Sequence, residues 1–424
     1  MTNLAVMVVL GIVINLFGLN RFIDAQGLNV GGLMVFSLVV GFGGATISLL
    51  MSKFIAKRST GAEIINDSRD PTHAWIVETV RRFADRDLRA WAADADRAGA
   101  APDRFAHVAG ELGFFLDAVP ADAGGLLEGP YSHTTRALRG HELGRGCAAL
   151  AALLECNVEP ALATAQWGSA AAKQALFTSL AAGGLATFVH DSRHTLAVAA
   201  EGDAIRISGK IGPAPALATA SHVLLATKDL LALVPTDGIR GEPMTPSGWR
   251  AAKWATATLE SHKVTADFIL ARGDAGHAAI AEVLAWARTS LAARAIGVAV
   301  GAMEHAEKYA KERIQFGQPI GTFESLIRLR DDALTNAAAA RLLALHAAWQ
   351  LDTQHVAAAD TASRARVIAG DVVTRATIDA VQIFGGYGFV NDYPVEKLMR
   401  DARAFEALYG DERLGRVLAQ KAVA

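Results

Sequence analysis

The sequence predicts a mostly α-helical protein with a small β domain in its middle and two transmembrane helices at its N-terminus. Two uncharged runs open the chain, helical periodicity fills residues 73–183 and returns from residue 275, and short β-type runs lie between about 186 and 270. We therefore expect four parts: a membrane anchor at 1–60, a helical domain at 61–185, a β domain at 186–272 and a helical bundle at 273–424.

The membrane anchor is predicted from two runs without charge, residues 4–19 and 30–52, of which the second is long enough to cross a bilayer. The first has no basic region before it and no small-residue cleavage site after it, which argues against a cleaved signal peptide. Three basic residues follow the second run: Lys53, Lys57 and Arg58. The positive-inside rule then predicts an inner (cytoplasmic) membrane protein whose remaining chain faces the cytoplasm.

The charge of the chain argues against a nucleic acid partner, and its two cysteines argue against a disulfide. The chain carries 41 basic and 43 acidic residues for a net charge of −2, and no nucleic-acid-binding motif, so we expect no nucleic acid partner. Cys147 and Cys156 lie in an Ala/Leu-rich run, which favours buried free thiols over a disulfide.

Turn residues mark the interruptions within these parts. The first helical part is broken by VPADAGGLLEGP at 119–130, and the bundle by GQPIGT at 317–322 and by GGYGFVNDYP at 385–394. The β domain is predicted from the runs ATFVH, TLAVAA, AIRISG, HVLLAT, LLALVP and HKVTADFIL. We expect loops at the three interruptions and short strands at the six runs.

The N-terminal wording, residues 2–58, closely resembles the membrane anchor of HtpX-type zinc metalloproteases, and the resemblance ends near residue 80. Such a protease needs H-E-x-x-H on a helix, with both histidines on Zn²⁺. The nearest approach is His141-Glu142-Leu143-Gly144-Arg145, and an arginine cannot bind a cation. We therefore expect the protease domain, and any metal site, to be absent.

Three other wordings resemble acyl-CoA dehydrogenases in their order and distances: ELGFFLDAVPADAGG at 111–125, ERIQFGQPIG at 312–321 and AVQIFGGYGFVNDYPVEKLMRDAR at 380–403. The resemblance covers about residues 75–424. It implies an N-terminal helical domain, a β-barrel-like middle domain and a C-terminal four-helix bundle, assembled as a dimer or tetramer. It also implies a flavoprotein oxidoreductase of lipid metabolism that acts on an acyl-CoA, with electron-transfer flavoprotein as its acceptor.

The resemblance implies that FAD binds between subunits. Arg313 and Phe316 would meet the pyrophosphate and adenine of a neighbour's flavin, while Gln382, Gly385 and Gly386 would let backbone approach the adenosine part. An arginine fork matches phosphate oxygens, and glycine admits close backbone contact. The middle domain departs from the family wording, because Gly209–Ala214 has Gly and Ala where an aromatic ring and a hydroxyl are expected beside the flavin.

The family removes an α-proton from an acyl-CoA with a carboxylate while a hydride leaves the β-carbon for the flavin. Tyr409 occupies the usual glutamate position, and Ala287 occupies the position that a minority of members use. A phenol is ionised in only about one molecule in 10³ near pH 7. Glu406, three residues earlier on the same helix face, is the alternative base, unless it is simply a solvated partner of Arg403. Arg288 matches a family arginine beside the active site.

Three hypotheses remain open. The first is a membrane-tethered dehydrogenase with FAD, an acyl-CoA substrate and a relocated base. The second is a non-catalytic subunit that supplies Arg313 and the 382–386 turn to the flavin of a competent homologue. The third is a scaffold that has kept the fold without ligands. The surviving interface wordings favour the second hypothesis over the third.

Overall fold

The structure is a computed structural model that describes residues 71–239 and 241–410. The chain divides into two units after Pro71, and the described elements belong to the second unit. The predicted transmembrane helices at 4–19 and 30–52, and the predicted domain at 1–60, lie outside the described residues.

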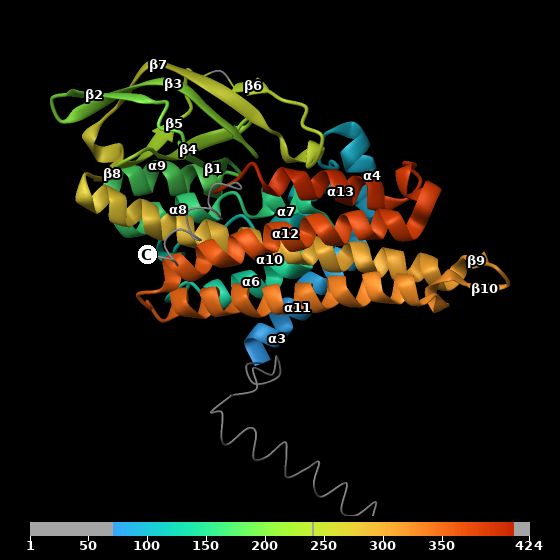
Figure 1. Ribbon diagram of the computed structural model, residues 1–424. Helices are drawn as coiled ribbons and strands as arrows, with labels where there is room; N and C mark the ends of the chain where they lie inside the picture. The colour runs from blue at the N-terminus through green and yellow to red at the C-terminus, as the bar shows by residue number, and fades with distance from the viewer. Residues whose placement is uncertain (1–70, 240, 411–424) are drawn as a thin grey trace, which may run out of the picture. The chain divides into compact units, whose positions relative to one another are not determined.

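The first helical part runs from α3 to α9 (Figure 1). Its elements are α3 (Pro71–Phe83), the π-helix η2 (Ala84–Leu88), α4 (Arg89–Ala98), α5 (Phe105–Glu111), η3 (Ala121–Ala123), α6 (His133–Gly146), α7 (Ala148–Leu154), α8 (Val158–Trp167) and α9 (Ala170–Ala181). Serine side chains cap two of these helices: Ser132 accepts from the Thr135 amide, and Ser169 from the Ala172 amide. Such caps satisfy amides that the first helical turn leaves without partners.

The middle part consists of two four-stranded sheets in the orders β1-β4-β5-β8 and β2-β3-β7-β6. The strands are β1 (Leu185–His190), β2 (Ala197–Glu201), β3 (Ala204–Ala214), β4 (Ala220–Ala226), β5 (Leu230–Pro235), β6 (Gly241–Pro243), β7 (Ala255–Val264) and β8 (Ile269–Arg272), with short helices η4 (Arg250–Ala252) and η5 (Ala266–Phe268) between them. β1 and β4 pair in parallel, and the other neighbours pair antiparallel. One apolar cluster, which includes Ile207 and Val223, draws side chains from both sheets.

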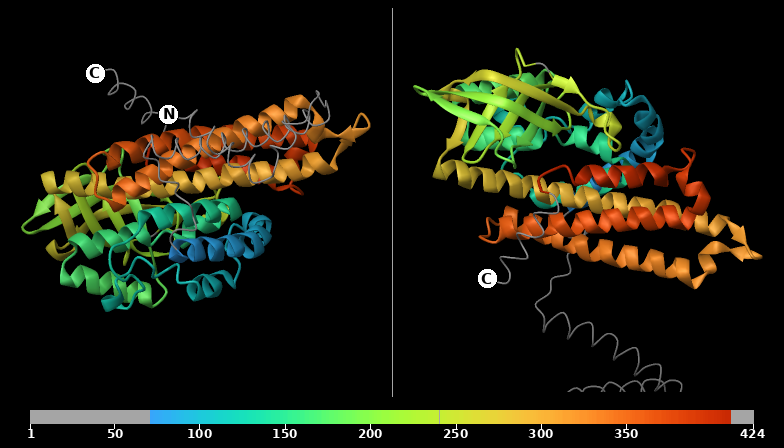
Figure 2. Two further views of the ribbon diagram at one scale, coloured as in Figure 1. Left: turned by 90° about the horizontal axis from the view of Figure 1, so that it is seen from below. Right: turned by 45° about the horizontal axis from the view of Figure 1, so that its top comes forward.

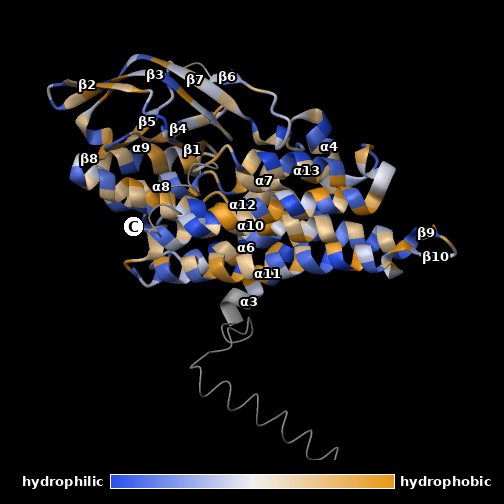
Figure 3. Cartoon of the chain, viewed as in Figure 1, coloured by the Kyte–Doolittle hydropathy of each residue, from blue (hydrophilic) through white to orange (hydrophobic). Residues whose placement is uncertain are grey.

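The last part is a bundle built on the 39-residue helix α10 (Asp274–Glu312), which runs beside α6, α11 and α12 (Figure 2). The other elements are the hairpin β9 (Ile314–Gln315) and β10 (Gln318–Pro319), η6 (Ile320–Thr322), α11 (Glu324–Asp352), α12 (Ala358–Phe384), η7 (Gly385–Phe389) and α13 (Pro394–Phe405). Polar and apolar residues alternate along α11 (Figure 3).

Two glycines let α6 and α10 approach closely. A Cβ atom on Gly144 of α6 would lie 2.1 Å from the carbonyl oxygen of Arg294, and one on Gly297 of α10 would lie 2.0 Å from that of His141. Real Cβ atoms do not make such contacts, so each helix needs glycine where it meets the other. The close packing brings the polar residues of α6 next to those of α10.

The predicted order of a helical part, a middle β part and a helical bundle is confirmed. The interruptions hold more structure than the expected loops: η3 lies within 119–130, β10 and η6 lie within 317–322, and η7 lies within 385–394. Within the described residues, two stretches are long and apolar enough to cross a membrane, Ala148–Trp167 and Asp274–Glu312, but 94% and 89% of their most apolar windows are buried inside the protein. Such burial is typical of core helices.

Candidate active site

A cavity of about 690 Å³ lies where the middle β part meets the residues that follow α13. The β part contributes His190 at the end of β1 and residues 210–214 at the end of β3, while the bundle contributes Arg288 and residues 406–410. All three predicted catalytic residues, Arg288, Glu406 and Tyr409, therefore line one cavity. We call it the main pocket.

Two arginines, the half-buried Arg288 and the buried Arg366, fix the backbone of the loop that carries Tyr409. Arg288 donates from Nε to the Tyr409 carbonyl at 2.8 Å and from Nη1 to the Ser363 hydroxyl at 2.9 Å. Arg366 donates to the carbonyls of Leu408 and Gly410 at 3.2 and 3.1 Å, and also to that of Phe405. Burial lowers the pKa of Arg288 to about 10, which leaves it charged near neutral pH. Arg288 therefore lies beside the pocket, where it anchors the loop that carries Tyr409.

Tyr409 is half-buried at the wall of the main pocket. Its ring stacks on Phe188 with centroids 5.2 Å apart and an interplanar angle of 22°. Burial raises the pKa of Tyr409, and the charge of Glu159 raises it further. A phenol with a raised pKa is an even weaker base than free tyrosine. The raised pKa therefore argues against Tyr409 as the catalytic base.

Glu406 combines the two roles that the sequence left open. It directly follows α13 and accepts a hydrogen bond from Arg403 at 2.7 Å, as the solvated-pair interpretation expects. Its side chain is 33% exposed and also lines the main pocket. Among the pocket residues described, it is one of two carboxylates; the other, Asp191, accepts from the Thr195 and Leu196 amides at 3.0 and 2.9 Å and so shapes a turn.

The sequence analysis did not assign a role to His190, which also lines the main pocket. Burial, together with the charges of Arg288 and His194, lowers the pKa of His190 to about 4, so its imidazole is neutral at pH 7. No pattern in the sequence singles out His190, because its burial and its nearness to Arg288 come from segments that are distant in the sequence. A neutral imidazole offers one donor and one acceptor to a ligand.

The five predicted cofactor-binding residues lie elsewhere, at the end of the bundle where α12 ends. The guanidinium of Arg313 sits 5.5 Å from the ring centre of Tyr387, which brings the 313–316 hairpin to the η7 turn that holds Gly385 and Gly386. Phe316 is 93% exposed at the hairpin tip, and Gln382 lies in the last turn of α12. None of the five lines the main pocket. Their role toward a neighbour's flavin stays a prediction.

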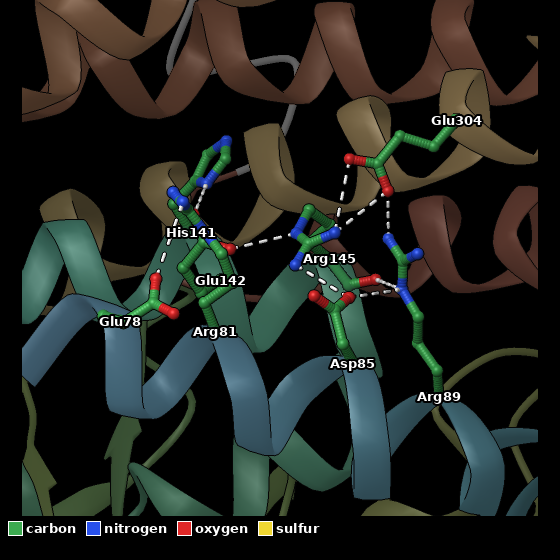
Figure 4. A network of polar contacts seen from close by, with 8 residues as sticks. All are labelled: Glu78, Arg81, Asp85, Arg89, His141, Glu142, Arg145 and Glu304. Atoms are coloured by element: carbon green, nitrogen blue, oxygen red, sulfur yellow. Dashed lines mark hydrogen bonds and ion pairs between the residues drawn. The ribbon is translucent and has the colours of Figure 1, made fainter.

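The near-match to a protease motif forms an ion-pair network instead (Figure 4). Glu142 pairs with Arg145 at 3.0 Å and with Arg81 at 3.3 Å, and Arg145 also pairs with Asp85 and Glu304. These contacts tie α3 and η2 to α6 and α10. Within residues 71–239 and 241–410, no group of three or more His, Cys, Asp or Glu side chains could hold a metal ion.

Comparisons with known proteins decide the family. Residues 70–184 match the N-terminal domain of acyl-CoA dehydrogenases, and residues 274–423 match the C-terminal domain. The chain belongs to the acyl-CoA dehydrogenase family. A cyclohex-1-ene-1-carbonyl-CoA dehydrogenase of Geobacter metallireducens is 28% identical over 82% of this chain and 96% of its own length. An acyl-CoA dehydrogenase of Bacillus subtilis is 42% identical over 149 residues, 35% of this chain and 39% of its own length.

Solved structures of acyl-CoA dehydrogenases share the fold. The butyryl-CoA dehydrogenase of Megasphaera elsdenii superposes with a TM-score of 0.76 at 22% identity and covers 85% of this chain and 100% of its own. A chain from the electron transferring flavoprotein structure of Acidaminococcus fermentans gives a TM-score of 0.75 at 25% identity, covering 85% of this chain and 99% of its own. The structural neighbours also include a glutaryl-CoA dehydrogenase of Mycobacterium smegmatis in complex with FADH2.

A second set of relatives is unrelated to acyl-CoA dehydrogenases. A protease HtpX homolog of Polaromonas naphthalenivorans is 45% identical over 143 residues, 34% of this chain and 47% of the protease. The aligned length of 143 residues is greater than expected, because the predicted resemblance to HtpX-type proteases ended near residue 80. The chain thus spans about two fifths of the first dehydrogenase relative and about half of each such protease.

Proposed function

We propose that the chain is a flavoprotein that oxidises an acyl-CoA thioester at its α,β carbon–carbon bond. The observation that supports this most directly is the main pocket itself, which joins Glu406, His190 and Arg288 from three separate segments in one cavity of about 690 Å³. Pockets of this volume suit a ligand of drug size or larger. The family match supports the reaction class.

The residues at the pocket fit the ring system of FAD in part. Residues 212–214 offer a wall without large side chains, and a Cβ atom on Gly212 would lie 2.8 Å from the Ala255 carbonyl oxygen. His190 brings a neutral imidazole to the same cavity. Residues 209–214 carry no aromatic ring and no hydroxyl, while the rings of Phe188 and Tyr409 line the same cavity from other segments. His190 and the backbone of 210–214 would hold the ring.

Each side chain at the pocket has a separate role in the reaction. Glu406 takes the α-proton of the thioester on its carboxylate, and Arg288 keeps the 406–410 loop in place through the Tyr409 carbonyl. FAD, when bound, accepts the hydride from the β-carbon. Proton and hydride together account for the two hydrogens that leave the substrate. The hydrogen bond from Arg403 orients the Glu406 carboxylate beside the pocket.

A second candidate function is a non-catalytic subunit in a heteromeric dehydrogenase. The observation that favours it is Tyr409, whose phenol stacks on Phe188 and has a raised pKa, and which the resemblance puts in the position of the usual glutamate. Such a subunit would present Arg313, Phe316 and the η7 turn to a partner's FAD. A scaffold without ligands is the third alternative, and it would bind neither flavin nor thioester.

The decisive experiment follows flavin absorbance of the purified full-length chain under anaerobic conditions with a panel of acyl-CoAs. The proposal expects bleaching that Glu406→Gln slows by about 10²-fold or more, the usual contribution of a positioned base. Glu324→Gln is the matched control, because Glu324 is exposed on α11 and pairs with Arg328 in a similar way. Bleaching that is unchanged in Glu406→Gln would remove Glu406 as the base. A colourless chain that co-purifies with a yellow homologue would establish the second candidate.

We further propose that residues 4–52 tether the protein to the inner membrane, that the protein is a homo- or hetero-oligomer, and that electron-transfer flavoprotein accepts its electrons. The match to HtpX homologs supports the tether, and the family supports the other two. Sodium carbonate extraction tests the tether: the full chain should stay with the membrane pellet, and a chain lacking residues 1–60 should not. Release of the full chain into the supernatant would refute the tether.

A further inference from the structure

Directly behind Tyr409, charged side chains are packed between α6, α8 and α10, where solvent does not reach. Arg136 and Arg139 of α6 are 2% and 8% exposed, and Glu155 and Glu159 are 2% and 5% exposed. Arg136 binds both Glu159 oxygens at 2.8 and 3.2 Å and Glu155 at 2.8 Å, while Arg139 binds Glu155 at 3.0 Å. These two arginines, together with the Ser290 hydroxyl on Glu155, satisfy both glutamates.

A third arginine lies in the same place and lacks a hydrogen-bonded partner for its guanidinium among the described residues. Arg294 of α10 is 7% exposed and, within the described part of the chain, makes no hydrogen bond or ion pair shorter than 4 Å. Its Nε is one of the buried nitrogens without an acceptor. Glu155 and Glu159 attract it only at longer range. A guanidinium stays charged in proteins, and burying a charge without a hydrogen-bonded partner is costly. Such a group marks a place where a ligand can supply the partner.

A small chamber adjoins Arg294. Its volume is about 20 Å³, and its lining includes Glu155, Glu159, Thr187, Trp249 and Arg294. The indole N–H of Trp249 is also buried without an acceptor in the described residues. Two donors without acceptors thus line one chamber. In its closed form the chamber has room for about one water molecule.

Tyr409 separates this chamber from the main pocket. Tyr409, Phe188 and Leu408 line both cavities, so the phenol forms part of the wall between them. The backbone of Tyr409 is held by Arg288, but its side chain makes no hydrogen bond in the described part of the chain and is kept in place by stacking on Phe188. Rotation of the side chain toward the main pocket would join the two cavities and break no hydrogen bond.

We propose that the chamber is a binding site for one carboxylate group, with Arg294 as its ion-pair partner and Tyr409 as a gate. Arg136 and Arg139 make the ion pairs of Glu155, Glu159 and Asp117, so within the described residues the Arg294 guanidinium has no hydrogen-bonded acceptor that an entering carboxylate would have to displace. The carboxylate has two possible sources: the far end of a short acyl group whose thioester lies in the main pocket, or a free small carboxylate. The first source rests on the proposed function, and the second does not.

Calorimetric titration of the full-length chain with three probes tests this inference. The probes are succinyl-CoA, 4-methylpentanoyl-CoA, which has the same shape with two methyl groups in place of the carboxylate oxygens, and free succinate. We expect succinyl-CoA to bind at least about tenfold more tightly than 4-methylpentanoyl-CoA, the size of a charge-assisted hydrogen bond to arginine. Arg294→Met should abolish that preference, and Tyr409→Ala should strengthen binding of succinyl-CoA by opening the gate.

Arg328→Met, which removes an exposed arginine of α11, is the matched control and should keep the preference. If Arg294→Met does not fold, Arg294→Lys keeps the charge without the fork and should reduce the preference severalfold. Arg294-dependent binding of succinate without binding of either thioester would support the site and refute the proposed function. Equal binding of both thioesters, or a preference that survives Arg294→Met, would overturn the site and leave the proposed function standing. Binding of none of the probes would overturn the site.

Discussion

The ring of Tyr409 lies flat on the ring of Phe188, with centroids 5.2 Å apart, and this pair separates the main pocket from the chamber behind it. Phe188 belongs to β1 and Tyr409 to the loop after α13, so the two rings also join the middle β part to the bundle. Tyr409, which the sequence resemblance puts at the family's catalytic position, thus contributes packing, and the predictions that follow depend on which side chain stands at position 409.

Replacing Tyr409 with glutamate should increase the rate at which acyl-CoA reduces the flavin. The loop backbone is held by Arg288 and Arg366 and does not depend on the phenol, so a carboxylate can take its place. We expect Tyr409→Glu to speed anaerobic flavin bleaching by acyl-CoA by about 10²-fold or more, since positioned bases contribute about 10²–10⁴-fold. Tyr409→Gln, which has the same shape without the charge, is the control and should show no gain. Equal rates in both variants would mean that position 409 does not face the substrate.

Removing Arg294 should not destabilise the protein, although Arg294 is buried, as Arg136 is. Arg294 makes no hydrogen bond in the described residues, so Arg294→Met loses no partner and removes a desolvated charge; we expect no loss of stability, or a gain of about 1 kcal/mol. Arg136→Met leaves two glutamates short of their partner and should cost about 3–5 kcal/mol. Urea unfolding of the two variants beside the wild type measures this contrast. A large loss in Arg294→Met would show that the guanidinium has a partner after all.

Acidification should destabilise the fold before the carboxylates are protonated. Burial, with the charge of Arg136, lowers the pKa of His133 to about 3, against about 6.5 in the unfolded chain. The unfolded state therefore takes up the proton first, so stability is full above pH 6.5 and falls as the pH drops toward 3. Between pH 6.5 and 5 this one group should cost about 2 kcal/mol.

The variant His133→Phe isolates that effect. The imidazole stacks on Trp286 with centroids 5.8 Å apart, and a phenyl ring can keep this stacking. Urea midpoints at pH 7.5 and 5.0 should differ less in His133→Phe than in the wild type. His190 and His305, whose pKa values burial lowers to about 4, should maintain part of the decline. An identical decline in both proteins would show that His133 is not buried in its neutral form.

The contact between α6 and α10 should be intolerant of a single methyl group. A Cβ atom on Gly144 would lie 2.1 Å from the backbone oxygen of Arg294, so Gly144→Ala must push the two helices apart. We expect a loss of about 2 kcal/mol or more, in the upper range for overpacked cores. Gly110→Ala on α5 is the control, since nothing lies within 4 Å of the added methyl, and it should be neutral or stabilising by up to about 1 kcal/mol. Thermal unfolding separates the two outcomes.

The sequence predicted the fold well because helical periodicity and strand texture are local properties. The change from helix to strand falls between Ala181 and Leu185, close to the predicted boundary near 185. The sequence also brought Arg288, Glu406 and Tyr409 to one site by resemblance, and the structure places all three around one pocket.

Arg294 and His190 could not be predicted in the same way. Both owe their character to segments that are distant in the sequence: α6 and the 155–159 segment surround Arg294, and Arg288 lies near His190. From the sequence, an arginine in an Ala-rich helix is expected on the surface, because the neighbouring helices that bury it are not known. Burial and the absence of a partner are properties of the packed fold, so they cannot be predicted from the local sequence around Arg294.

The anchoring of the 406–410 loop through its carbonyl oxygens has an evolutionary consequence. Because Arg288 and Arg366 grip the main chain, natural selection can exchange the side chain at position 409 without rebuilding the loop. Gain or loss of a carboxylate at that position is then a single-residue event. The conformation of the loop backbone is thus independent of the side chain at position 409.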